Sequence, residues 1–341
     1  MGNKNFQEIQ EIGFTSLIKK FAGYTGSVNQ SVLKGIGDDA SVLKSENGKV
    51  ICTTSEIFLE GVHFDLTYTP FHHLGYKLVT AAVSDIYAMN ASPEQLLVSI
   101  AIPNKYSVQM MEQLYKGIDA ACKDYKIQLT GGDTTASHQV LSISVTCTGV
   151  AAEKDIVYRS GAKVDDLICV TGDLGAALAG LRILLREKKE WKENPDSNFQ
   201  PELEDYEYVV QRQLVPRARI DYHEALGKSD VKIHALMDVT QGLVADLKSM
   251  ANASGVGLTL YSPAVPISLD TRKVADEMKE DVDKYAFYGG EDFEMLFTLS
   301  EPDVEKFKTN FDDFSVIGKV TDQDKLLKIN TGEDQTIEIE L

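Results

Sequence analysis

The sequence FHHLGYKLVTAAVSDIYAM occupies residues 71–89 and repeats apolar residues at helical spacing. Leu74, Leu78 and Met89 fall on one face of the predicted helix. Asp85 falls on the same face, where an unpaired charge is very costly, so its carboxylate must meet a cation, a metal ion or several donors. The alternative is a helix register shifted by one residue, which would expose Asp85.

Strand-like and helix-like segments alternate around this helix, which is the pattern of an α/β or α+β protein. Runs rich in Val, Ile, Leu and Thr predict strands at residues 50–54, 95–102 and 141–150. A second apolar repeat at helical spacing predicts a helix over residues 108–125. We therefore expect the first half of the chain to form a sheet that helices cover.

The chain turns polar over residues 151–163, and we place a domain boundary there, between residues 1–152 and 153–341. The second half begins with a predicted strand, Leu167–Thr171, followed by an Ala/Leu helix to about residue 185. Residues 186–207 are highly charged and predict a surface excursion.

A further helix follows Thr240 and ends near Gly255, a good C-terminal glycine signal. Three strand-like runs complete this half, at residues 258–261, 295–299 and 314–320. The second half is thus expected to be an α/β domain of its own.

The composition is strongly acidic, with 34 Lys and Arg against 52 Asp and Glu and a net charge of −18 over 341 residues. Such a surface repels nucleic acid and anionic membranes, so neither is expected as a partner. The apolar content of 43% is ample for two domain cores. Composition alone favours an ordinary acidic protein; the alternative is that bound cations neutralise part of the excess acid.

The cysteines predict a reducing environment. Cys52, Cys122, Cys147 and Cys169 show no CxxC spacing, and we expect buried free thiols. The N-terminal residues carry no apolar signal core, and no apolar run in the sequence approaches membrane-spanning length. We therefore expect a cytoplasmic protein.

Five short acidic clusters lie far apart in the chain, each beside glycine or a hydroxyl residue. They are GIGDD at 35–39, SD at 84–85, GGDTT at 131–135, DVTQG at 238–242 and GGED at 289–292. Carboxylates near flexible backbone are what a protein needs to hold Mg²⁺ against polyphosphate. The sequence has no P-loop GxxxxGK[ST] and no GxGxxG at a strand-to-helix turn, so acids and metal ions would replace a lysine-bearing loop.

The five acidic clusters differ in how strongly the neighbouring sequence indicates a functional site. GIGDD alone is a weak signal, since Gly-Asp is common in plain turns. GGDTT follows a strand-like run and predicts an end-of-strand loop, in which a ligand contacts backbone amides while Asp133 binds metal. Thr240 is a plausible N-cap of the next helix, which explains the threonine but not Asp238. A helix N-terminus also favours anions such as phosphate.

The histidines give no catalytic arrangement. His63 is a lone histidine beside apolar residues, most often a hydrogen-bonded, half-buried residue. His72 and His73 open a helix and are expected to be solvated. No zinc spacing and no Ser-His-Asp or Cys-His arrangement emerges from the sequence.

In order along the chain, these motifs resemble those of the thiamine-monophosphate kinase family, within the aminoimidazole-ribonucleotide synthetase superfamily. The matching stretches are GIGDDASVL (35–43), LEGVHF (59–64), SDIYAMNASP (84–93), GGDTT (131–135), RSGAK (159–163) and GGEDFEML (289–296). The likeness runs from about residue 10 to about residue 320. Other branches of the superfamily, which carry a reactive cysteine near the start or at the C-terminus, fit less well.

The resemblance implies a two-domain synthetase-superfamily fold. An N-terminal mixed sheet with helices, in residues 1–152, would bind ATP and Mg²⁺ and join a second copy in a barrel-like homodimer interface. Residues 153–341 would form a C-terminal α/β domain. The implied reaction transfers the γ-phosphoryl group of ATP directly to thiamine phosphate, with several Mg²⁺ ions as cofactors. The acceptor is already an oxyanion, so no covalent or general-base catalytic residue is expected.

The resemblance also implies roles for individual residues. The family's metal-ligand positions are Asp39, Thr54, Ser55, Glu56, Asp85, Asp133 and Asp238. Its nucleotide-contact positions are Gly132, Asp133, Arg159 and Thr240. Its substrate-contact positions are His63 and Glu291.

Four departures from the family pattern bear on these roles. Glu56 stands where the family usually has Asp, and Gln241 replaces a family Asp, which would weaken or remove one metal site. Ala82 replaces an Asn, and the polar tail after Val320 lacks the family's C-terminal aromatic. Two alternatives to an active kinase therefore stay open: a nucleotide-binding homologue with weakened or no catalysis and a regulatory role, or an enzyme of the same superfamily with a different acceptor.

Overall fold

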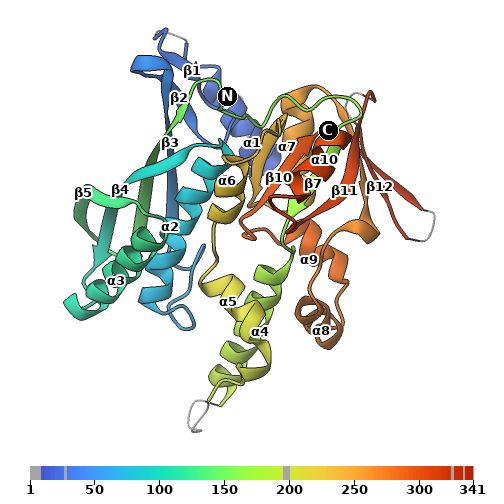
Figure 1. The fold of residues 1–341 in the computed structure, drawn as a ribbon. Helices are drawn as coiled ribbons and strands as arrows, with labels where there is room; N and C mark the ends of the chain where they lie inside the picture. The colour runs from blue at the N-terminus through green and yellow to red at the C-terminus, as the bar shows by residue number, and fades with distance from the viewer. Residues whose placement is uncertain (1–8, 27–28, 195–199, 324–325, 333–334, 341) are drawn as a thin grey trace, which may run out of the picture.

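The computed structural model describes residues 9–26, 29–194, 200–323, 326–332 and 335–340. Within them the chain forms two mixed sheets, one in each half, with helices packed against them. Figure 1 shows the two sheets side by side, with α2 of the first half facing the second half and α4 and α5 projecting from one end. The expected two-domain α/β architecture is confirmed.

The N-terminal sheet has the strand order β1-β2-β3-β6-β4-β5. Its strands are β1 Val32–Lys34, β2 Ser41–Lys44, β3 Lys49–Leu59, β4 Ser92–Pro103, β5 Gln128–Ser137 and β6 Ser142–Ala152. β4 and β5 are parallel, and the other neighbours are antiparallel. The predicted strands are confirmed but are longer, because the ladder between β3 and β6 continues through Leu59 and Ala152.

Two long helices cover one face of this sheet, and a short 3₁₀ turn, η1 Glu46–Gly48, joins β2 to β3. The helices are α2 Phe71–Ala88 and α3 Val108–Asp124, in agreement with the two predicted from apolar spacing. α2 is buried from Leu74 to its end, because it lies between the sheet and α3 on one side and the C-terminal half on the other. The remaining N-terminal helix is α1 Ile9–Ala22.

The C-terminal sheet has the order β13-β12-β9-β11-β7-β10-β8 and is antiparallel except for β12 and β9. Its strands are β7 Leu167–Thr171, β8 Ala235–Val239, β9 Gly257–Tyr261, β10 Glu294–Leu299, β11 Phe314–Thr321, β12 Leu326–Asn330 and β13 Thr336–Glu340. The helices and 3₁₀ turns of this half are α4 Ala176–Glu193, η2 Glu204–Tyr206, α5 Glu207–Leu214, α6 Ile220–Leu226, α7 Leu243–Ser254, η3 Ser262–Ala264, α8 Leu269–Met278, α9 Val282–Tyr288 and α10 Glu301–Lys308.

The prediction that residues 186–207 form a surface excursion is confirmed for the described residues, most of which are exposed, but the predicted end of the preceding helix is wrong. α4 does not end near residue 185 but continues to Glu193, and the buried Glu187 carboxylate accepts the Glu202 amide at 3.1 Å. The charged sequence therefore extends the helix rather than ending it. Residues 195–199, which belong to the same predicted segment, lie outside the described residues.

All four cysteines are free and buried, as expected. In the part of the chain that the structure describes, no helix has the length and apolar character needed to cross a membrane. The Trp191 side chain, near the end of α4, is half exposed.

The packing of α2 on α3 depends on two glycines that face each other. A Cβ atom at Gly117 would lie 1.9 Å from the carbonyl oxygen of His72, and one at Gly75 would lie 2.1 Å from that of Leu114. Contacts this short do not occur, so the helices approach closely only because both positions lack a side chain. This approach fixes the height of α2 above the sheet.

We predict that Gly117→Ala destabilises the protein by about 1–3 kcal/mol, because the added methyl group must push two backbones apart. Gly227→Ala is the matched control, since its Cβ would meet nothing nearer than 3.5 Å. Urea unfolding of both variants measures the difference. Equal stability of the two variants would contradict the close-packing argument.

Candidate functional site

Three aspartates from distant parts of the chain meet where the two domains touch. Asp39 precedes β2, Asp85 lies near the C-terminal end of α2, and Asp238 lies on β8. One oxygen of each carboxylate lies within 4.8 Å of the other two. Asp85 is 9% exposed and Asp238 1% exposed, so the prediction of a buried Asp85 is confirmed. The end of a helix at which Asp85 lies disfavours a negative charge, which adds to the need for a cation.

Each aspartate has one strong donor. The Thr54 hydroxyl donates to Asp85 Oδ2 at 2.5 Å, and the Ser84 hydroxyl donates to Asp238. The Arg159 guanidinium donates to Asp39 and, through Nη1, to Ser249 Oγ at 2.7 Å. One guanidinium and two hydroxyls therefore serve three carboxylates.

The electrostatics of the cluster favour a further cation. Burial raises the pKa of Asp39 to about 7, although Arg159 lowers it, and the charge of Asp238 raises it further. Burial also raises the pKa of Asp238 to about 6 and that of Asp85 well above its usual range. Asp39 Oδ2 is buried and has no hydrogen-bond partner among the described residues. Hard oxygen ligands with an unsatisfied acceptor fit a divalent cation such as Mg²⁺.

β3 brings two of its three predicted metal ligands to this cluster. The side chains of Thr54 and Glu56 both face α2. Burial there raises the pKa of the Glu56 carboxyl, and a hydrogen bond with Asp85 opposes the rise. Side chains alternate along a strand, so Ser55 points to the other face of the sheet. There its Oγ lies 3.0 Å from Thr146 Oγ1. Glu56 therefore belongs to the cluster by position, whereas the Ser55 side chain does not.

The GGDTT segment is part of β5, so the prediction of an end-of-strand loop is wrong. The carbonyl oxygen of Val98 on β4 would lie 1.7 Å from a Cβ at Gly132, so glycine there admits the neighbouring strand. Asp133 pairs in register with Ser99 and shares its exposed face, opposite to α2. Within one chain, the Asp133 side chain therefore lies on the other side of the sheet from Asp85, whereas Gly132 pairs with the buried Val98.

Thr240 does not cap α7, contrary to the prediction. Gly242 precedes the helix with φ of +97°, and this turn delays the first helical residue to Leu243. Asp246, in the first turn, accepts hydrogen bonds from the amides of Thr240 and Gln241 at 3.1 and 3.2 Å. Asp246 is 2% exposed, and burial raises its pKa well above the usual range. The segment after Asp238 is thus held by a buried carboxylate rather than by a threonine hydroxyl.

A cavity of about 460 Å³ contains both residues expected to contact the substrate, His63 and Glu291. His63 is more exposed than expected, but its Nδ1 accepts a hydrogen bond from the Leu59 amide at 3.1 Å. Lys77 of α2 is 3% exposed, and its Nζ donates to Glu291 Oε2 at 2.9 Å and to the Gln213 carbonyl at 3.1 Å. The cavity is therefore formed by both domains.

The backbone that carries Glu291 is held in an unusual conformation. Glu291 and Phe293 have backbone φ angles of +57° and +54°, which residues other than glycine rarely adopt. The Glu291 amide donates to the Thr240 carbonyl, and the Phe293 amide donates to the Val239 carbonyl at the end of β8, each at 3.0 Å. Neighbouring Asp292 is fixed in turn, since both of its oxygens accept the Gly175 amide at 3.0 Å.

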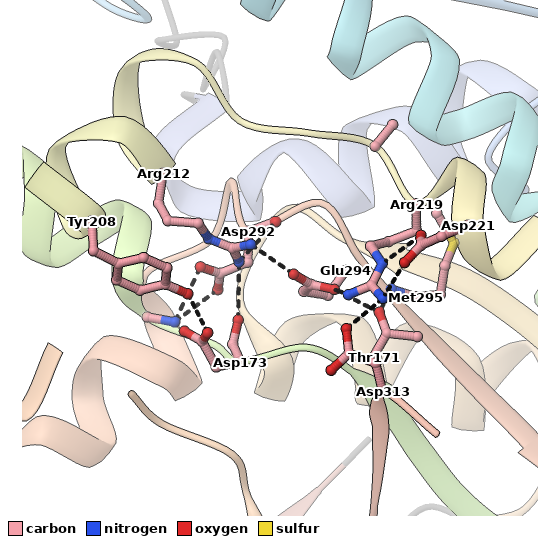
Figure 2. Close-up of polar contacts among 12 residues, drawn as sticks. Thr171, Asp173, Tyr208, Arg212, Arg219, Asp221, Asp292, Glu294, Met295 and Asp313 are labelled. Atoms are coloured by element: carbon pink, nitrogen blue, oxygen red, sulfur yellow. Dashed lines mark hydrogen bonds and ion pairs between the residues drawn. The ribbon is translucent and has the colours of Figure 1, made fainter. Parts of the chain in front are cut away.

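Two arginines, Arg212 and Arg219, secure the same segment, as Figure 2 shows. Glu294 is fully buried and lies between Arg212 and Arg219, each 2.8 Å from one of its oxygens. Arg212 also donates to the Asp292 carbonyl at 3.3 Å. Such fully paired buried charges restrict the backbone to one arrangement, which positions the Glu291 side chain in the cavity.

Sequence reasoning missed three buried charged residues that shape the site: Lys77, Asp246 and Glu294. Lys77 had a usable signal, since it lies on the same helix face as Asp85, two turns earlier. Asp246 had none, because its role depends on where α7 begins. Glu294 is the first residue of β10, where a charged side chain is unremarkable in the sequence, and only the fold reveals its arginine partners.

The sequence matches the models of two protein families over most of its length. They are AIR synthase related protein, N-terminal domain, at residues 37–151, and AIR synthase related protein, C-terminal domain, at residues 163–327. The chain is thus an AIR synthase related protein, in agreement with its two-domain fold.

More specific relatives are thiamine-monophosphate kinases. The chain is 34% identical to that of Aquifex aeolicus (strain VF5) over 293 residues, 86% of each chain. It is 34% identical to that of Bacillus subtilis (strain 168) over 282 residues, 82% of each. A solved structure described as AaThiL complexed with AMPPCP and TMP has a TM-score of 0.81 and 29% identity, over 99% of this chain and 98% of that one. The chain belongs to the thiamine-monophosphate kinase family.

We predict that, with a chelator present, the free energy of unfolding falls as pH rises from about 4 to about 7. The folded carboxyls of Asp39 and Asp238, with pKa values of about 7 and 6, keep protons that the unfolded chain has already released. The loss would be on the order of 3 kcal/mol for the cluster. Urea unfolding at pH 5 and 7.5 measures it.

Asp85→Asn should reduce this pH dependence, because it removes one of the repelling charges. Asp276→Asn, at an exposed position on α8, is the control for the general acidity of the surface. If both variants keep the full pH dependence, the cluster is not its source.

Proposed function

We propose that this protein transfers the γ-phosphoryl group of ATP to the phosphate of thiamine phosphate, which gives thiamine diphosphate and ADP. An acceptor phosphate oxygen forms a bond to the γ-phosphorus while the bond to the β,γ-bridging oxygen breaks, and its electron pair leaves with ADP. The observation that carries the proposal is that α2 joins the Asp39–Asp85–Asp238 cluster to the cavity of His63 and Glu291, since it contributes Asp85 to the cluster and Lys77 to the cavity. Family membership supports it, and a relative was solved with AMPPCP and TMP.

Asp39, Asp85 and Asp238, with Thr54 and Glu56 beside them, are the residues that would hold Mg²⁺. The unsatisfied, buried Asp39 Oδ2 supports this assignment. When bound, Mg²⁺ neutralises phosphate charge and stabilises the transition state. The acceptor arrives as an oxyanion, so the chain itself has only to position the two anions in line.

Arg159 is the residue we assign to nucleotide phosphate, together with Thr240 and Gly132. Its guanidinium is already oriented by Asp39 and Ser249 and offers planar donors to phosphate oxygens. His63 and Glu291 are assigned to the acceptor. In this scheme residues 1–152 supply most of the metal ligands, and residues 153–341 supply Asp238, the nucleotide contacts Arg159 and Thr240, and Glu291.

The test is to incubate the full-length protein with ATP, Mg²⁺ and thiamine phosphate and to detect thiamine diphosphate by mass. Product is expected, and EDTA should abolish it. Asp85→Asn should lower kcat/KM by about 100-fold or more while the chain stays folded, and Asp276→Asn should have no effect. Bound ATP without product would reject the kinase proposal, and ADP formed only with other acceptors would identify a different phosphotransferase.

We also propose a homodimer formed through the face of the N-terminal sheet that α2 and α3 leave uncovered. Ser55, Ile57, Leu97, Ser99 and Asp133 are exposed on the strands of this sheet. The family resemblance implies a barrel-like interface at this sheet. Because Asp133 faces away from Asp85 within one chain, a second copy would have to bring its own Asp133 to the site.

Co-expression of Asp85→Asn and Asp133→Asn chains tests this arrangement. If Asp133 acts across the interface, mixed dimers contain one intact site, and about a quarter of the wild-type activity returns. If both residues act within one chain, the mixture stays as inactive as either variant alone. Light scattering should give twice the chain mass.

A cytoplasmic location is a further proposal, supported by four buried free thiols that an oxidising compartment would not preserve as readily. Fractionation of the host cells, followed by immunoblotting, checks it. Detection outside the cytoplasmic fraction would contradict it.

A further inference from the structure

The cavity of His63 and Glu291 also contains a half-buried aromatic ring, Tyr68, to which the proposed function assigns no role. The cavity volume of about 460 Å³ lies within the range of ~300–1,000 Å³ found for small-molecule sites. Leu181 and Leu185 of α4 give the cavity an apolar wall. A flat heterocycle therefore finds both an aromatic and an aliphatic surface here.

Two ion pairs flank the Tyr68 ring. Lys188 of α4 pairs with Asp65, and its Nζ lies 5.7 Å from the centroid of the Tyr68 ring. The second pair joins Lys77 to Glu291.

Burial raises the pKa of the Tyr68 hydroxyl, and the charges of Asp65 and Glu291 raise it further. Both carboxylates thus act on the ring, and the ring already has a cation near it. Each of these carboxylates is paired with a lysine, so the four groups carry no net charge, but the position of Lys188 shows that a cation fits within reach of the ring.

α2 sets the spacing between this cavity and the aspartate cluster. Lys77, which lines the cavity, and Asp85, which belongs to the cluster, lie eight residues apart on one side of the helix. At 1.5 Å per residue, this separation is roughly 12 Å. A ligand with its ring in the cavity can therefore extend a short arm along α2 and place a phosphate toward the cluster.

We propose that Tyr68, flanked by Asp65 and Glu291, is the surface on which the cationic thiazolium ring of thiamine phosphate stacks. The inference rests on the proposed kinase function, since it is this acceptor that supplies a permanently charged ring. A cation over an aromatic face is attracted by the ring's quadrupole, most strongly where water is excluded. Tyr68 is a specificity-determining residue, because it favours a charged heterocycle over a neutral one of the same shape.

The test measures the dissociation constant of thiamine phosphate by calorimetry, with the full chain and Mg²⁺. Tyr68→Leu should raise the constant about tenfold, whereas Tyr68→Phe, which keeps the aromatic face, should stay within about twofold. Tyr261→Leu, an exposed tyrosine on β9, is the matched control and should leave binding unchanged. Binding of ATP should be the same in all variants.

A second probe isolates the charge. In a thiophene analogue of thiamine phosphate, carbon replaces the charged ring nitrogen, and Tyr68→Leu should weaken its binding by no more than about twofold. Equal losses for the charged and neutral ligands would overturn the proposal, and so would unchanged binding of thiamine phosphate to Tyr68→Leu.

The two proposals fail separately. If the wild-type protein makes no thiamine diphosphate but binds thiamine phosphate through Tyr68, the kinase function fails and the ring site stands. If it makes the product and Tyr68→Leu binds normally, only the ring site fails.

Discussion

Mutual repulsion among buried carboxylates is the constraint on which the rest of this structure depends. Asp39, Asp85 and Asp238 are brought together from a loop, a helix and a strand, and the two domains have to meet for all three to be adjacent. Burial without enough positive charge raises their pKa values, so the ion-free site stores unfavourable free energy. Binding of the cation that we propose would recover this free energy and would couple the folded state to that ligand.

The fold keeps the three carboxylates together because the segments next to them are held by contacts outside the cluster. α2 is buried along most of its length and is held at a set height by its glycine contact with α3. On the other side, Glu294 between two arginines anchors the backbone that carries Glu291. Both supports are rigid and lie outside the cluster, so the three carboxylates cannot relax by moving apart. The well-packed contacts around the cluster thus offset the unfavourable free energy of the three buried carboxylates, a trade-off that is common at functional sites.

The sequence predicted the elements better than the details of their ends. Apolar spacing located α2 and α3 and the face that carries Asp85, because these depend on local periodicity. It failed at Thr240, where one glycine conformation moved the start of α7, and at the charged end of α4, which continues to Glu193. These outcomes depend on contacts between distant residues, which a single sequence does not contain.

The same distinction explains which site residues sequence reasoning placed correctly in space. Asp85 was recognisable because an unpaired charge on a buried, apolar helix face is energetically costly, so it has to have a partner. Asp133 was assigned to the same metal set by resemblance, yet in one chain it faces away from Asp85, across the sheet. A motif records that residues act together in a working protein, whether they meet within one chain or between two. The pleat of β5 places Asp133 on the face of the sheet that α2 and α3 leave uncovered. This placement is the reason why we propose that Asp133 reaches the site from a second copy of the chain.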